Sequence, residues 1–244
     1  MEHATELWIT AIFNNYLAGV GNFFLELVGR HAEARPWANY VTMQFLVALI
    51  IVALFAILRP RLSFDNPGKL QHVLELVYGF ISGQTDEQVG HEGKRYLGYF
   101  GTIFLFVLFC NLIGIIPGFQ SPTMFPPVPL GCAVATFLYY NLAGIAANGP
   151  LKYAGHFAGP IWWMAPLMVP IEIVSHLARP LSLTIRLYAN MYAGEQVTMV
   201  FLGLTYFLIP AVFMGLHVFV SLLQAYIFML LTMMYVAGAT AHEH

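Results

Sequence analysis

Charged residues are scarce in this chain of 244 residues, since Asp, Glu, Lys and Arg make up 9% and hydrophobic residues 59%. An average soluble domain contains about 25% charged residues, so this sequence lacks the side chains needed to cover a water-exposed surface. The formal net charge of −2 offers no basic surface for nucleic acid. The two cysteines, Cys110 and Cys132, lie in apolar runs without disulfide or zinc-site spacing. We expect an all-α integral membrane protein with no metal, no cofactor and no nucleic-acid partner.

The few charges are also unevenly distributed. Between residues 96 and 241 the chain contains only five charged residues: Lys152, Glu172, Arg179, Arg186 and Glu195. The other seventeen lie in the first 95 residues or at Glu243. The first third of the chain is therefore expected to hold the water-facing segments, and the remainder to lie in the lipid bilayer or against other membrane proteins.

The N-terminal region predicts how the chain enters the membrane. Residues 1–6 have no basic region, and no cleavage site follows a short apolar core, which argues against a secretory signal or a transit peptide. Residues 37–58 are apolar enough to cross a bilayer core of about 30 Å as a helix. Arg59 and Arg61 follow this helix and predict that it ends in the cytoplasm. We therefore expect a bacterial inner-membrane protein with its N-terminus outside and its C-terminus in the cytoplasm.

Four further segments have helical patterns. Residues 9–28 include polar side chains and indicate a peripheral or partly inserted helix. Residues 69–81 predict an amphipathic helix, either at the membrane surface or packed against a partner. Residues 97–116 and 130–147 predict a transmembrane hairpin joined by a proline-rich turn.

The C-terminal part is too long for simple upright helices. Residues 161–240 are almost continuously apolar, with a turn near residues 203–210. Each half has about 30–40 residues, or about 45–60 Å as helix, so we expect two strongly inclined helices. The expected organisation has about five to six helices in five segments: an N-terminal peripheral segment (1–36), a transmembrane helix (37–58), a cytoplasmic-side segment (59–95), a transmembrane hairpin (96–150) and a long inclined hairpin (151–244).

A polar stripe runs along the first of these long helices. Its members recur every three or four residues: Glu172, Ser175, Arg179, Ser182, Arg186 and Asn190. That spacing places them on one helix face. Because a charge at bilayer depth costs from about 2.5 to more than 10 kcal/mol, the stripe is expected to line water or to face a binding partner.

Other polar residues extend this pattern. Glu195 lies nine positions after Arg186, which places it on the opposite side of a straight helix and about 13 Å further along. On the last helix, His217, Ser221 and Gln224 make a second, shorter stripe.

Several of these residues also have purely structural interpretations. Arg179 could extend to the membrane interface, Glu172 could be a carboxylate near the cytoplasm, and His217 could be a core histidine bonded to a backbone carbonyl. Asn111, the isolated polar residue of its apolar segment, could form a hydrogen bond to a neighbouring helix. Arg186 is harder to explain in this way, because its guanidinium remains charged and Glu195 faces elsewhere. Its partner carboxylate is therefore expected on another chain.

Three stretches resemble one known family. Residues 179–195 read RPLSLTIRLYANMYAGE and resemble the signature of subunit a of the F-type ATP synthase. His217 with LQAYIF at residues 223–228 resembles the family's last helix, and NLIG at residues 111–114 resembles an upstream segment. The resemblance extends from about residue 37 to the C-terminus.

This resemblance implies a membrane stator subunit without a catalytic site of its own. The implied partners are the c-subunit ring, the b subunits of the peripheral stalk, the lipid bilayer and, indirectly, the F1 sector. Arg186 corresponds to the coupling arginine that faces a ring carboxylate and prevents proton leakage between two aqueous half-channels.

The resemblance also implies roles for the other polar residues. Glu195 and His217 match the outer half-channel, and Glu172 and Ser175 match the region near the cytoplasmic one. Asn190 and Gln224 match polar neighbours of the arginine. Four more residues are possible members of the pathway: Arg179, Ser182, Ser221 and Asn111.

Two features depart from the family pattern. Gly114 occupies a position where some members carry an acidic residue. The apolar, proline-rich residues 125–129 replace a polar segment, which removes polar groups from that side of the outer entrance.

Three alternatives belong to other classes of membrane protein. An ion-coupled secondary transporter also buries Arg, Glu and His, but the chain has no internal repeat. A membrane cytochrome could hold a haem between His176 and His217. A purely structural anchor leaves Arg186 unexplained.

Overall fold

The computed structural model describes residues 6–27, 29, 31–63, 67–116, 118–150, 153, 165–204 and 208–240. Its α-helices are α1 (Trp8–Tyr16), α2 (Ala18–Leu27), α3 (Asn39–Leu58), α4 (Lys69–Gln88), α5 (Leu97–Leu112), α6 (Pro127–Asn148), α8 (Ala165–Leu204) and α9 (Leu208–Thr240). Short 3-10 turns are η1 (Arg59–Arg61), η2 (His91–Tyr96), η3 (Ile113–Ile115) and η4 (Pro122–Met124). The expected all-α class is confirmed, and within these residues the longer helices α3–α9 match those expected from the sequence.

Several helix boundaries differ from the sequence expectations, and α5, for example, ends at Leu112 rather than residue 116. The peripheral segment 9–28 forms two short helices, α1 and α2, rather than one. Helix α4 continues beyond residue 81 to Gln88. Helix α6 begins at Pro127 rather than residue 130, because proline is well suited to the first turn of a helix. The proline-rich residues therefore contribute both a turn and the start of α6.

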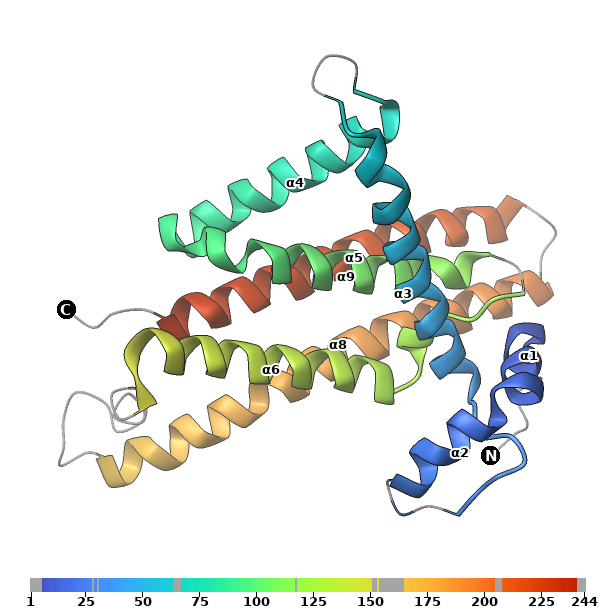
Figure 1. Ribbon diagram of the computed structural model, residues 1–244, viewed down its shortest axis with the longest axis horizontal. Helices are drawn as coiled ribbons and strands as arrows, with labels where there is room; N and C mark the ends of the chain where they lie inside the picture. Colours follow the sequence, from blue (N-terminus) through green and yellow to red (C-terminus); the bar gives the residue numbers. More distant parts are fainter. Residues whose placement is uncertain are drawn as a thin grey trace.

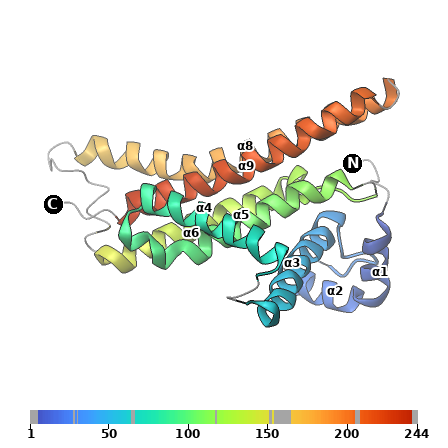
Figure 2. The same cartoon turned by 90° about the horizontal axis from the view of Figure 1, so that it is seen from above.

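Four helices pack side by side in the centre of the molecule. Helices α5, α6, α8 and α9 run nearly parallel to its long axis, and α3 crosses them (Figure 1). From above, α8 and α9 lie along one side and α1–α3 gather at one end (Figure 2). The bundle core contains Phe100 of α5, Tyr140 of α6, Leu187 of α8 and Met229 of α9, each at most 1% exposed. This packing gives α8 one buried face and leaves its other face uncovered.

Within the described part of the chain, four helical segments are long and apolar enough to cross a membrane: Asn39–Arg61, Gly93–Ile115, Pro127–Asn148 and Ala211–Thr240. Helix α8 has 40 residues and α9 has 33, or about 60 and 50 Å. Both exceed the bilayer core of about 30 Å. Their lengths agree with the expected long hairpin, and their inclination in the membrane stays a prediction.

Helix α8 remains continuous through Pro170 and Pro180. Membrane helices tolerate interior prolines because neighbouring helices and Ser or Thr side chains compensate for the lost hydrogen bonds. The polar stripe is therefore carried on one uninterrupted helix.

Candidate functional site

Arg186 lies at the edge of the buried face of α8. Leu183 and Leu187, at 3% and 0% exposed, point into the core on either side of it. Ser182 and Asn190, one turn before and one turn after Arg186, are exposed, and Arg186 itself is half-buried. The stripe expected from the sequence thus follows the boundary between the packed and the uncovered faces of α8.

The guanidinium of Arg186 forms no ion pair and no hydrogen bond with the residues that the structure describes. Glu195 on the same helix faces a cavity to which Arg186 does not contribute. The expectation that Glu195 is not the partner of Arg186 therefore agrees with this placement.

An amide pair lies one helical turn beyond Arg186. The side-chain Nδ2 of Asn190 donates to Oε1 of Gln224 on α9 at 2.8 Å. Gln224 is 2% exposed, and its Nε2 has no hydrogen-bond acceptor within the described chain. An unsatisfied buried donor costs about 1–3 kcal/mol. The amide pair joins α8 to α9 one turn beyond Arg186.

Two cavities lie beside the second half of α8. One of about 240 Å³ is lined by Glu195, Thr198, His217 and part of the loop that follows α5. The other, of about 260 Å³, is lined by Asn190, Gly194 and His217. His217 therefore lies between the cavity of Glu195 and the amide neighbour of Arg186.

Gly194 makes room for this histidine. A Cβ atom at position 194 would lie 2.9 Å from Nδ1 of His217, closer than real Cβ contacts allow, and 3.4 Å from its Cε1. The imidazole therefore packs directly against the backbone of α8. The sequence alone did not reveal this function of Gly194, because it depends on how α8 and α9 pair.

The two charged stripe residues nearer the start of α8 lie close to each other. Nη2 of Arg179 lies 3.6 Å from Oε1 of Glu172. Its guanidinium also lies 5.4 Å from the ring centroid of Tyr235 on α9. Ser175, on the same stripe, is exposed. Arg179 is thus a paired residue rather than one that simply extends to the membrane interface.

A hydrogen-bonded cluster that the sequence analysis missed lies beside this ion pair. His176 of α8 contacts the hydroxyl of Tyr140 at 3.3 Å and Oδ1 of Asn141 at 2.9 Å, both on α6. The hydroxyl of Tyr153 donates to the same oxygen of Asn141 at 2.8 Å. No spacing in the sequence signals this cluster, because its members come from separate segments.

The haem alternative is not compatible with this arrangement. His217 packs against Gly194, which lies eighteen residues after His176 on the same helix, or about 27 Å away along its axis. The two histidines therefore cannot ligate a single haem.

Asn111 and Ser221 join helices within the core. Oδ1 of Asn111 accepts from Thr123 at 2.7 Å, and its Nδ2 donates to the backbone carbonyl of Ser221 at 3.4 Å. The hydroxyl of Ser221 contacts Sδ of Met191 at 4.0 Å. Asn111 and Ser221 are both fully buried, so these contacts favour the structural interpretation that was left open for Asn111.

The two departures from the family pattern have packing explanations. A Cβ atom at Gly114 would lie 2.8 Å from the backbone nitrogen of Ser121, so an acidic side chain does not fit here. Phe125, in the apolar turn, packs against Tyr40 of α3 with ring centroids 5.6 Å apart. The apolar turn is therefore closed by packing against α3, whereas Gly114 itself lines the 240 Å³ cavity that contains Glu195.

The fold and the site define an all-α, multi-pass membrane protein that carries charged and amide side chains along one long helix. The profile of the family described as "ATP synthase A chain" matches residues 41–237. The chain is 71% identical over 233 residues to ATP synthase subunit a of Solibacter usitatus, covering 96% of this chain and all of that protein. It is 50% identical over 242 residues to ATP synthase subunit a of Koribacter versatilis, with 98% of each covered.

This chain belongs to the ATP synthase A chain family. The resemblance found in the sequence is thereby confirmed, and the match favours that family over the secondary-transporter alternative.

Proposed function

We propose that this chain is the membrane stator subunit of a rotary ATP synthase in a bacterial inner membrane. It provides two offset half-channels that carry protons to and from carboxylates on a c-subunit ring, and Arg186 couples this flow to rotation. The observation that carries the proposal is the half-buried Arg186, which has no ion pair within the described chain and lies on the uncovered side of a family-matched helix.

A ring carboxylate supplies the missing partner of Arg186. An opposite charge nearby favours the ionised carboxylate, whereas apolar lipid favours the protonated form. A carboxylate that reaches Arg186 therefore releases its proton and must take up another before it returns to lipid. The fixed positive charge also prevents protons from passing directly between the half-channels.

The outer half-channel runs through the cavities around Glu195 and His217. These two titratable side chains line the 240 Å³ cavity together, and His217 also lines the 260 Å³ cavity that includes Asn190. A proton entering at Glu195 thus has a route toward the amide pair next to Arg186. Intramembrane Glu and His residues are typical members of proton relays.

The inner half-channel opens near Glu172 and Ser175. Glu172 lies twenty-three residues before Glu195 on α8, or about 35 Å along the helix. The two openings are therefore offset along the ring surface. A membrane potential of 100 mV contributes about 2.3 kcal/mol for each charge that crosses, and the offset converts this into rotation in one direction.

The c-ring contacts the uncovered face of α8. Ile185 and Leu181 on this face are 55% and 57% exposed, and Ser182 lies beside them. The b subunits of the peripheral stalk hold this chain, and through it the ring interface, fixed relative to the F1 sector. The N-terminus lies outside and the C-terminus in the cytoplasm.

Photo-cross-linking tests the position of the ring. A photoreactive amino acid at Ser182, one turn before Arg186, is expected to form an adduct with the c subunit in the assembled complex. The same group at Leu138, 55% exposed on α6, is the matched control and is expected to give none. An adduct from Leu138 but not from Ser182 would place the ring on the wrong face and contradict the proposal.

A further inference from the structure

Helices α1 and α2 carry most of their large apolar side chains on the outside of the molecule. The exposed fraction is 47–83% at Trp8, Ile12, Tyr16, Phe23, Phe24 and Leu27. In contrast, Thr10 and Asn14 of α1 are only 1% and 8% exposed. A surface helix of a soluble protein has the reverse arrangement, with its apolar stripe toward the core. The surroundings of α1 and α2 are therefore expected to be apolar.

Hydrogen bonds fix α1 against the chain at the start of α3. The hydroxyl oxygens of Thr10 and Thr42 lie 2.7 Å apart, and both residues are at most 1% exposed. Oδ1 of Asn14 accepts from the backbone nitrogen of Trp37 at 2.9 Å, and its Nδ2 donates to the carbonyl of Trp37 at 3.2 Å. Because these polar side chains are satisfied internally, α1 has a defined orientation in which its exposed apolar side chains point away from α3.

Close packing fixes α2 against the same part of the chain. A Cβ atom at Gly21 would lie 2.7 Å from Cγ of Pro36, so the backbone of α2 rests on the segment that leads into α3. The indole nitrogen of Trp37 donates to the carbonyl of Leu17, between α1 and α2, at 2.9 Å. The exposed apolar side chains of α2 lie on the other side of this helix.

The contacts with α3 place α1 level with the edge of the bilayer core. The apolar segment that contains α3 runs over Asn39–Arg61, and α1 meets it in its first turn. The backbone nitrogen of Leu7, just before α1, donates to Oδ1 of Asn39 at 3.2 Å. The contact at Thr42 lies three residues further along α3, or about 4.5 Å. This depth fits an interfacial helix, which buries its apolar face about 5–10 Å into the boundary between headgroups and acyl chains.

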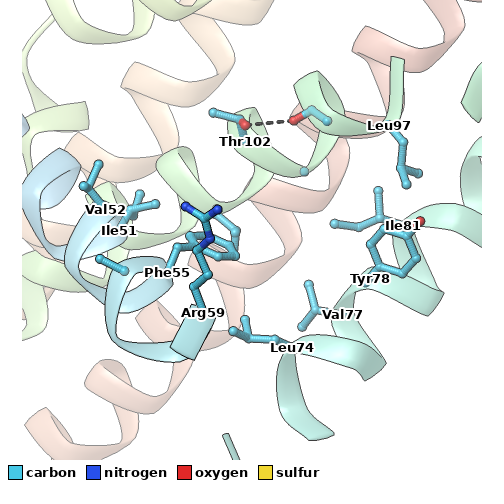
Figure 3. Close-up of a pocket in the computed structure, with 14 residues that line it drawn as sticks. Ile51, Val52, Phe55, Arg59, Leu74, Val77, Tyr78, Ile81, Leu97 and Thr102 are labelled. Carbon is cyan, nitrogen blue, oxygen red and sulfur yellow. Dashed lines mark hydrogen bonds between the residues drawn. The ribbon is translucent and has the colours of Figure 1, made fainter. Parts of the chain in front are cut away.

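The far end of α3 indicates which leaflet is involved. Helix α3 has 20 residues, or about 30 Å, which is about the thickness of a bilayer core. At its far end Arg59 lines a groove between α3, α4 and α5, together with Phe55 and Leu74 (Figure 3). Arg59 and Arg61 mark this end as cytoplasmic by the positive-inside rule. Helices α1 and α2, at the other end of α3, therefore lie at the outer leaflet.

We propose that α1 and α2 form a foot embedded in the outer leaflet of the bilayer, with lipid acyl chains packed against the exposed apolar side chains of both helices. Trp8, Tyr16 and the adjacent Trp37 suit this level, because Trp and Tyr are enriched where a bilayer meets water. Residues 8–27 contain a single charged side chain, Glu26, so the foot is held by apolar contact and not by attraction to anionic lipid. This inference rests on the membrane insertion of α3 and does not depend on the proposed rotary function.

Fluorescence quenching in the assembled complex tests the foot. An environment-sensitive fluorescent amino acid replaces Phe23, and the complex is placed in vesicles of phosphatidylcholine, which has no net charge, with bromine on the acyl chains. We expect bromine to quench this position about threefold more strongly than iodide added in the water, because Phe23 lies below the headgroups. The matched control is the same amino acid at Glu33, which is exposed between α2 and α3 and is expected to be quenched mainly by iodide.

Two variants test what holds the foot in lipid, with the fluorescent amino acid kept at position 23. Phe24→Asp combined with Leu27→Asp places two charges on the exposed side of α2. Because charges in the bilayer are costly, we expect this variant to lower the quenching by bromine about threefold. Glu26→Gln changes the same helix without adding charge and is expected to leave the quenching unchanged.

Three results would overturn the proposal. Stronger quenching by iodide than by bromine at Phe23 would place the foot in water. Weak quenching by both, together with cross-links from a photoreactive residue at Phe23 to another subunit, would show that a protein covers this face. Undiminished quenching by bromine in the double aspartate variant would show that the apolar side chains do not hold α2 in the bilayer.

Discussion

The two arginines of α8 lie two helical turns apart on the same flank, but only one of them has an ion-pair partner among the described residues. Arg179 lies 3.6 Å from Glu172 and 5.4 Å from the ring of Tyr235. Arg186 has no ion pair among the described residues. The first half of α8 therefore satisfies its charge internally, and the second half leaves a charge for a partner.

The surroundings of the two arginines differ in the same way. Beside Arg179, His176 bonds to Tyr140 and Asn141 in a closed cluster. Beyond Arg186 lie the two cavities at His217 and the buried Nε2 of Gln224, which has no acceptor among the described residues. The comparison teaches that a polar residue in a membrane helix indicates function most strongly when its own chain leaves it unpaired.

The largest effect among the cavity residues is expected at Glu195. Glu195→Gln keeps the size of the side chain but cannot release a proton, so ATP-driven acidification of inverted vesicles should fall by about tenfold or more. Glu195→Asp retains the carboxyl group and should preserve measurable pumping. Full pumping by the glutamine variant would show that Glu195 is not part of the pathway. The second half of α8 would then differ less from the first half, whose charges are paired internally.

A smaller loss is expected when the histidine beside the cavity is displaced. In Gly194→Ala the new methyl group would lie 2.9 Å from Nδ1 of His217, so the ring must shift. Because a shift of about 1 Å at a reacting group costs up to about 100-fold, we expect pumping to fall by about threefold to tenfold. Gly203→Ala is the control on the same helix, where a Cβ atom meets nothing within 4 Å. Equal pumping by both variants would argue against a function for the His217 position.

The core contact of Asn111 should affect stability but not coupling. Asn111→Ala removes bonds to Thr123 and Ser221, which we expect to lower the free energy of unfolding by about 1–3 kcal/mol. Thermal unfolding of the assembled complex measures this. Thr232→Ala is a control, because this buried hydroxyl bonds only within its own helix. Pumping per assembled complex should stay within about twofold of the unmodified value. A loss as large as that of Glu195→Gln would indicate that Asn111 is part of the proton pathway.

The periodicity of the sequence predicted the parts of this site that one helix determines. A spacing of three or four residues placed Arg186 and Asn190 on one flank, and the nine-residue step placed Glu195 away from them. The helix lengths could also be predicted, because the length of an apolar run and its periodicity are both properties of one segment of the sequence.

What the sequence did not predict depends on pairs of helices. The contact of Gly194 with His217, the stacking of Arg179 over Tyr235 and the bond of Asn141 to His176 each join segments that are far apart in the chain. No single-helix pattern carries information on such pairs. The contact of Arg179 with Tyr235 therefore required the tertiary structure, whereas its ion pair with Glu172 joins two residues of α8.

The most direct measurement compares the two arginines in one assay. ATP-driven acidification of inverted vesicles is recorded for Arg186→Ala and Arg179→Ala at equal amounts of assembled complex. We expect Arg186→Ala to abolish acidification, because no other described cation takes its place at the ring. Arg179→Ala removes a partly exposed pair worth up to about 1 kcal/mol and should leave substantial pumping. Retained pumping in Arg186→Ala, or equal loss in both variants, would contradict the assignment of Arg186 as the coupling residue.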